Sequence, residues 1–163
     1  IGELYSTEKS FHQLLIFTYN NYMKTMQKAV QGKDSLVKAS DVQVLFYALP
    51  EMINVSENLL AYLKKYMDGV IYQECTPGMA LGHIFKLLES KMVAFLKYAT
   101  HYKVNMKSIR KARAGAYITK IENQLKLQKA NNRLDLADYL IAPFQRVPRY
   151  GLLIKGITES LER

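Results

Sequence analysis

The sequence contains little cysteine and no long apolar run. Cys75 is the single cysteine among 163 residues, so an intramolecular disulfide is excluded. A lone thiol is typical of a cytoplasmic protein, and Cys75 has no partner motif, which predicts an ordinary loop thiol. No apolar stretch reaches the roughly 18 residues that a membrane-spanning helix needs. The start at Ile1 shows no signal-like core, and because it is not Met we expect a piece of a longer protein.

The sequence also lacks the motifs of the common hydrolytic and nucleotide-binding enzymes. It has no Gly-rich phosphate loop, no Gly-x-Ser-x-Gly elbow and no Cys-His pair. His12, His83 and His101 are widely separated, and none has a Cys or second His at ligand spacing. We therefore expect structural or surface histidines, no metal ion, no cofactor and no covalent chemistry.

Apolar residues recur every three or four positions along almost the whole chain, which indicates helices. No alternating pattern is long enough to predict a strand. Hydrophobic residues make up 49% and charged residues 23% of the chain, as in ordinary globular domains. The length suits one domain with its own core. These features predict an all-α fold, an elongated bundle of long helices.

Four helical segments precede the last one. Their predicted bounds are 1–30, 40–67, 81–99 and 105–129. Ser40 and Asp41 are the expected N-cap of the second segment, and Pro50 predicts a kink or a break after Leu49. Gly115 predicts a bend in the fourth segment. Gly and Pro residues between 68 and 78 indicate a loop, and we expect residues 131–133 to end the fourth segment.

The last segment is a helix that contains Pro143 and Pro148, and Asp135 stands at its favourable acidic start. Each proline removes a backbone donor, so this helix must bend or be held by tertiary packing. The apolar spacing predicts one buried stripe, formed by Leu136, Leu140, Phe144 and Val147.

A second row on this helix carries Ile141, Gln145 and Arg149, spaced four residues apart. This row could contact a partner. Spacing alone favours a simpler interpretation for Gln145 and Arg149, namely a solvated helix face.

The run from Asp138 to Lys155 reads Asp-Tyr-Leu-Ile-Ala-Pro-Phe-Gln-Arg-Val-Pro-Arg-Tyr-Gly-Leu-Leu-Ile-Lys. It resembles the most characteristic segment of the Dbl homology domain, the exchange module for Rho-family GTPases. The opening Glu-Leu-Tyr-Ser-Thr-Glu, from Glu3 to Glu8, resembles the first signature of that family. The resemblance implies a Dbl homology domain over 1–163. It also implies that the first and last helices lie side by side, with Glu3 near Gln145 and Arg149.

The resemblance implies an exchange factor that acts by differential binding, accelerating GDP release from a Rho-family GTPase without covalent chemistry. Glu3 matches the acidic residue that engages switch I, and Gln145 and Arg149 match positions that contact switch II. Thr7 and Leu152 are further expected GTPase-binding residues. Ile141 is similar to a position that influences the choice of GTPase, and isoleucine there favours a Rac-like partner.

Two acidic residues in the first segment have alternative interpretations. Glu3 in a first helical turn is favourable through the helix dipole alone, and Glu8 could be an internal salt-bridge partner.

We also expect the chain to be incomplete at its C-terminus. It stops at Arg163, before the last helix and the pleckstrin homology domain that commonly follow in the family.

Basic charge is concentrated between Lys103 and Arg133. This segment holds nine Lys or Arg residues against Glu122 alone, and so carries +8 of the net charge of +9. A solvated face is the simplest interpretation, followed by contact with anionic membrane lipids. Tyr117 is the only aromatic residue in this segment, which gives no stacking platform for nucleic acid. A helical scaffold or membrane-associated module using this basic helix is therefore the alternative to an exchange factor.

Overall fold

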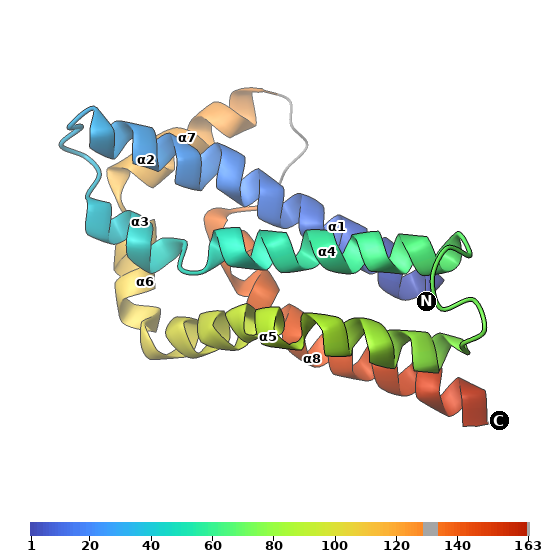
Figure 1. Cartoon of the computed structure of the whole chain (residues 1–163). Coiled ribbons are helices and arrows are strands. Elements are labelled where there is room, and N and C mark those ends of the chain that lie inside the picture. The colour runs from blue at the N-terminus through green and yellow to red at the C-terminus, as the bar shows by residue number, and fades with distance from the viewer. Residues whose placement is uncertain (129–133, 163) are drawn as a thin grey trace.

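The computed structural model describes residues 1–128 and 134–162, with side chains described for 1–128 and 134–151. Every regular element in these ranges is a helix, and together they form an elongated bundle (Figure 1). The predicted all-α bundle is confirmed. The helices are α1 (Gly2–Thr18), the π-helical turn η1 (Tyr19–Met23), α2 (Lys24–Gln31), α3 (Ala39–Leu45), α4 (Leu49–Met67), α5 (Pro77–Val104), α6 (Met106–Arg113), α7 (Ala116–Leu127) and α8 (Leu136–Glu162).

The first segment is one continuous helical path from α1 through η1 to α2, as the sequence predicted for residues 1–30. A π-turn holds one extra residue in the helix, and therefore rotates the apolar face that follows it. Leu15 before the turn, Tyr22 within it and Met26 after it are all almost completely buried. The turn thus lets one long helix keep its apolar side on the core.

The second segment is two helices, α3 and α4, and the predicted position of the break is wrong. The chain leaves α3 at Phe46, and Ala48 adopts a left-handed conformation with φ of 58°. Pro50 lies in the first turn of α4, where its missing N–H costs nothing. The break therefore precedes Leu49 instead of following it.

The predicted cap of the second segment is also displaced. The N–H groups of Asp41 and Val42 donate to the Lys38 carbonyl oxygen, at 3.0 and 3.4 Å, so Lys38 is the N-cap and the helix begins at Ala39. Ser40 and Asp41 lie within the first turn.

The third segment is confirmed and is longer than predicted. The 28-residue α5 begins directly after Thr76, whose hydroxyl accepts a hydrogen bond from the Met79 N–H at 3.3 Å. The fourth segment is α6 and α7, separated by a break where a bend was predicted, since Gly115 is extended at the start of α7. The expected end of this segment at 131–133, and Lys129 itself, lie outside the described residues.

Helix α8 is continuous through both prolines. It begins after Asp135, whose N–H donates to Asp138 Oδ2 at 3.0 Å. The predicted buried stripe is partly wrong, because Phe144 is 38% exposed and lies beside the ring of Tyr102, with centroids 5.5 Å apart. The inward face is instead formed by Leu136, Tyr139, Leu140, Pro143, Arg146 and Tyr150.

Helices α1, α4, α5 and α8 pack along their lengths. Helices α2, α3, α6 and α7 gather at the end of the bundle remote from the N-terminus, where they also contribute buried residues to the core (Figure 1). Helix α8 lies against α1 and α5, so the first and last helices of the chain are neighbours. None of the helices in the described part is long and apolar enough to cross a membrane.

Ala48 provides a test of the break between α3 and α4. A left-handed conformation costs a residue with a Cβ about 1–2 kcal/mol, and glycine avoids that cost. We expect Ala48→Gly to raise the free energy of unfolding by about 0.5–1 kcal/mol, measured by urea denaturation. The matched control is Ala61→Gly on the exposed side of α4, which should lower it by about 1 kcal/mol. Equal destabilisation by both substitutions would contradict the assigned backbone.

Candidate functional site

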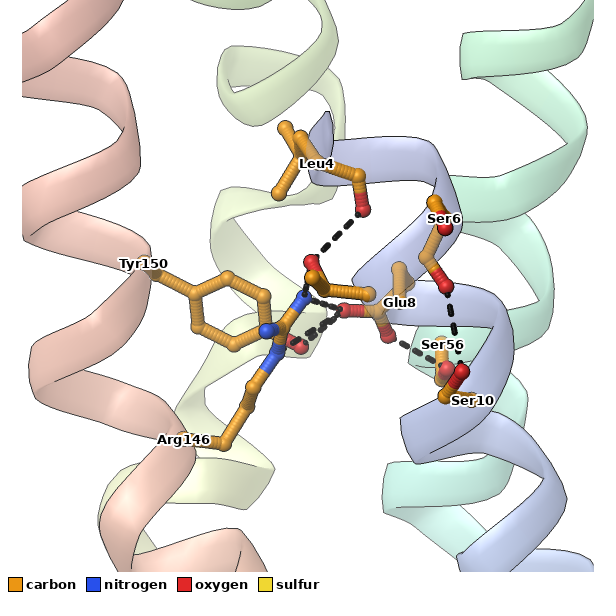
Figure 2. Close-up of polar contacts among 8 residues, drawn as sticks. Leu4, Ser6, Glu8, Ser10, Ser56, Arg146 and Tyr150 are labelled. Carbon is orange, nitrogen blue, oxygen red and sulfur yellow. Dashed lines mark hydrogen bonds and ion pairs between the residues drawn. The ribbon is translucent and has the colours of Figure 1, made fainter. Parts of the chain in front are cut away.

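The first and last helices are joined by a buried carboxylate. Glu8 on α1 is 0% exposed, and three side chains donate hydrogen bonds to it (Figure 2). Arg146 donates from Nη2 at 2.9 Å and from Nε at 3.3 Å, and the Tyr150 hydroxyl donates at 2.6 Å, all to Oε1. The Ser56 hydroxyl on α4 donates to Oε2. We call Glu8, Ser56, Arg146 and Tyr150 the buried carboxylate network.

Aromatic rings enclose the network. The Arg146 guanidinium lies 4.6 Å from the ring centroid of Tyr150 and 5.6 Å from that of Phe11, an arrangement that favours a cation. The Tyr150 ring packs edge-on against Phe95 at 5.8 Å. Burial, and after it the negative charge of Glu8, raises the pKa of the Tyr150 phenol well above its ordinary value. Tyr150 is therefore a neutral hydrogen-bond donor at physiological pH.

A second ion pair lies on the surface above this network. Arg149 Nη2 is 3.2 Å from Glu3 Oε1, and the side chains remain 51% and 68% exposed. The two residues are 146 positions apart in the sequence, and the packing of α1 against α8 brings them together. The predicted proximity of Glu3 and Arg149 is confirmed.

Thr7 adds a further polar contact between α1 and α8. Its hydroxyl accepts a hydrogen bond from Arg146 Nη2 at 3.2 Å and donates one to the Leu4 carbonyl oxygen at 3.2 Å. Gln145 is exposed one turn before Arg149 on α8. We call Glu3, Thr7, Gln145 and Arg149 the α1–α8 surface. The side chain of Leu152 lies outside the described residues.

Ile141 continues the row of Gln145 and Arg149 towards the start of α8. It is half-buried, and it lines a hollow of about 330 Å³ between α8 and α6. Two guanidinium groups, Arg110 and Arg113, line the same hollow, together with the Asp138 carboxylate and the aromatic ring of Tyr102. The row on α8 therefore presents an apolar side chain at Ile141 and polar side chains further along, at Gln145 and Arg149.

Sequence reasoning anticipated Glu8 as an internal salt-bridge partner but missed Arg146 and Tyr150. The available signal was their position, since both lie on the inward face of α8, three to seven residues after the buried Pro143. The predicted stripe placed the exposed Phe144 on that face, whereas Val147 is partly buried against the core as predicted. Among the described residues, no three His, Cys, Asp or Glu side chains gather into a group that could hold a metal ion. The α1–α8 surface presents charged and polar side chains.

The chain belongs to the RhoGEF domain family, because the family model of that name matches residues 1–163. It is 32% identical over 153 residues to Rho guanine nucleotide exchange factor osg-1 of Caenorhabditis elegans, covering 94% of this chain. It is 23% identical over 164 residues to human Proto-oncogene vav, and 27% identical over 161 residues to Guanine exchange factor for Rac 30 of Dictyostelium discoideum. These matches cover 99% and 98% of the chain.

The chain spans only a small part of each relative, 12% of osg-1, 18% of vav and 9% of the Dictyostelium protein. The similarity therefore concerns one domain of larger proteins. It confirms the resemblance to the Dbl homology family seen in the two signature segments.

The two ion pairs should differ sharply in their effect on stability. Glu8→Ala leaves Arg146 buried without its carboxylate, and breaking a buried pair in this way costs about 3–5 kcal/mol. Glu3→Ala removes a partner from an exposed pair that contributes at most about 1 kcal/mol. We expect these two losses in the free energy of unfolding, measured by urea denaturation at neutral pH.

Tyr150→Phe serves as an intermediate case. It removes one donor to Glu8 and keeps the ring, so we expect a loss of about 1.5–3 kcal/mol, typical of a hydrogen bond to a charged group. If Glu3→Ala were as destabilising as Glu8→Ala, the assignment of buried and exposed roles would be wrong.

Proposed function

We propose that this RhoGEF domain is a guanine nucleotide exchange factor that accelerates GDP release from a Rho-family GTPase, with a Rac-like GTPase as its partner. The observation that carries the proposal is the exposed Glu3–Arg149 pair, formed by the two segments that carry the family signatures. Membership of the family supports the general activity.

The exposure of this pair suits an exchange mechanism. An exposed ion pair contributes little stability, so a bound GTPase can replace each partner at small cost. Glu3 would engage switch I, and Gln145 and Arg149 would contact switch II. Exchange is accelerated when these contacts are stronger in the nucleotide-free GTPase than in the GDP-bound form. The domain then acts by differential binding and supplies no reacting group.

Two observations support a Rac-like partner. Ile141 offers a branched apolar side chain beside the hollow that Arg110 and Arg113 line. One relative, which is 27% identical, is named for Rac. Selectivity would come from the fit of the GTPase against Ile141, while Glu3 and Arg149 contact the switch regions.

Release of a fluorescent GDP analogue from a panel of purified Rho-family GTPases tests the exchange activity. We expect the purified chain to accelerate release from Rac. Glu3→Ala and Arg149→Ala should each lower the acceleration about 10- to 100-fold, because each removes a charge-assisted hydrogen bond made in the nucleotide-free complex.

Lys64→Ala is the matched control. It breaks the Lys64–Asp68 pair on α4, which is also exposed, with an N–O distance of 3.0 Å. This variant should keep the wild-type rate. Wild-type rates in both site variants would exclude the roles of Glu3 and Arg149, and no acceleration with any GTPase would overturn the exchange activity itself.

Ile141 can be tested separately for selectivity. Ile141→Ala removes apolar contact area at the hollow, and losses of this kind change discrimination about 10- to 200-fold per substrate group. We expect kcat/KM for Rac to fall by about tenfold or more relative to the other GTPases in the panel. An equal loss for all of them would show that Ile141 contributes affinity without selectivity.

A further inference from the structure

The outer side of α5 and α6 carries positive charge and exposed aliphatic side chains together. At about 100° per residue, Leu96, Lys97, Lys103 and Val104 fall within about one third of the circumference of α5. Leu96 is 60% exposed and Val104 is 75% exposed. On α6, Lys107 and Lys111 are also exposed and lie one turn apart on the same side of that helix. We call these six residues the basic outer face.

The charge on this face is not neutralised within the described part of the chain. The ion pairs found there involve other cations, namely Lys64, Lys86, Arg146 and Arg149. Asp41 lies on α3, which packs against α6, yet it forms no ion pair with Lys107 or Lys111 in the described structure. The four ammonium groups, two on α5 and two on α6, are therefore exposed without a paired carboxylate among the described residues.

The surface beside these lysines is partly apolar. An open hollow of about 500 Å³ is lined by Tyr47, Leu96, Lys97, Thr100, His101, Val104 and Asn105, a set without a carboxylate. The Tyr47 ring is already stacked on His101 with centroids 4.3 Å apart, so one of its faces is covered. Asn105 holds the corner between α5 and α6 by donating from Nδ2 to the His101 carbonyl oxygen at 3.0 Å. The exposed Val104 thus stands at a fixed corner between Lys103 and Lys107.

We propose that the basic outer face binds the surface of a membrane that contains anionic lipids. Clustered lysines attract negatively charged headgroups, and exposed aliphatic side chains beside them enter the interface between headgroups and acyl chains. Nucleic acid is the weaker match, because the apolar contacts on this face are mainly aliphatic and offer little surface for base stacking. Figure 1 shows α6 at the opposite end of the bundle from the N-terminus, so the α1–α8 surface near Glu3 stays accessible when lipid is bound.

Vesicle flotation tests this proposal. We expect the chain to float with phosphatidylcholine vesicles that contain phosphatidylserine and to stay behind with pure phosphatidylcholine. Added salt should weaken the binding and leave a smaller residual part that depends on the apolar side chains. The triple variant Lys103→Gln, Lys107→Gln, Lys111→Gln should lower the partition coefficient about a hundredfold, since each lysine near an anionic surface contributes about fivefold. Leu96→Ser with Val104→Ser should remove the binding that persists at high salt.

The matched control removes three lysines elsewhere, Lys64→Gln, Lys65→Gln and Lys86→Gln, with the same change in net charge. It should lower the partition coefficient less than fivefold, and circular dichroism should show that all variants fold. Equal losses in the two triple variants would overturn the proposal, because net charge alone would then explain binding. It would also be overturned if the chain bound a single-stranded oligonucleotide or an acidic protein through these lysines and no vesicle.

The exchange assay separates this proposal from the proposed function. In solution without vesicles, the Lys103, Lys107 and Lys111 triple variant should release GDP from Rac at the wild-type rate, because none of the three lies on the α1–α8 surface or lines the hollow beside Ile141. A parallel fall in exchange and in lipid binding would place these lysines in the GTPase contact instead, and would overturn their assignment to lipid.

Discussion

The Glu8 carboxylate is the constraint on which the arrangement of the helices depends. A buried ionised carboxylate is stable only when hydrogen bonds and an opposite charge surround it. Glu8 receives them from Ser56 on α4 and from Arg146 and Tyr150 on α8. A shift of α8 along α1 by one turn would leave both Glu8 and Arg146 unpaired in the core. The network therefore fixes the position of α8 along α1, and with it the position of every exposed side chain on both helices.

The two prolines of α8 are tolerated because other helices support the chain there. Pro143 removes the donor that would bond to the Tyr139 carbonyl oxygen. Next to this point, the buried Tyr98 hydroxyl of α5 donates to the Leu140 carbonyl oxygen. Pro143 itself is buried, whereas Pro148 lies on the exposed side one turn beyond Phe144. The core therefore holds the chain in place at Pro143, where α8 stays continuous.

Periodicity predicted the long helices well, since burial of one face repeats every three or four residues whatever the neighbours are. It could not place the breaks. The break at Phe46 to Ala48 depends on a left-handed conformation at Ala48, and alanine gives no sequence signal for that conformation. The exposure of Phe144 depends on which face of α8 the helix α5 covers. Arg146 was missed because a charged residue in an amphipathic pattern is read as solvent-facing unless its buried partner is known. The Glu3–Arg149 contact spans 146 positions, so only the resemblance to a family could suggest it.

The two layers of charge between α1 and α8 have different physical roles. Arg146 is held by hydrogen bonds to Glu8 and Thr7, so the backbones of both helices are positioned before any partner arrives. Among the described side chains, Glu3 and Arg149 pair with each other alone, in water, where an ion pair contributes little. A partner that replaces this pair gains nearly the full energy of its own contacts, because the exposed pair that it displaces contributes little. A rigid buried layer beneath a weakly bound exposed layer is therefore the arrangement expected of a surface that acts through binding energy alone.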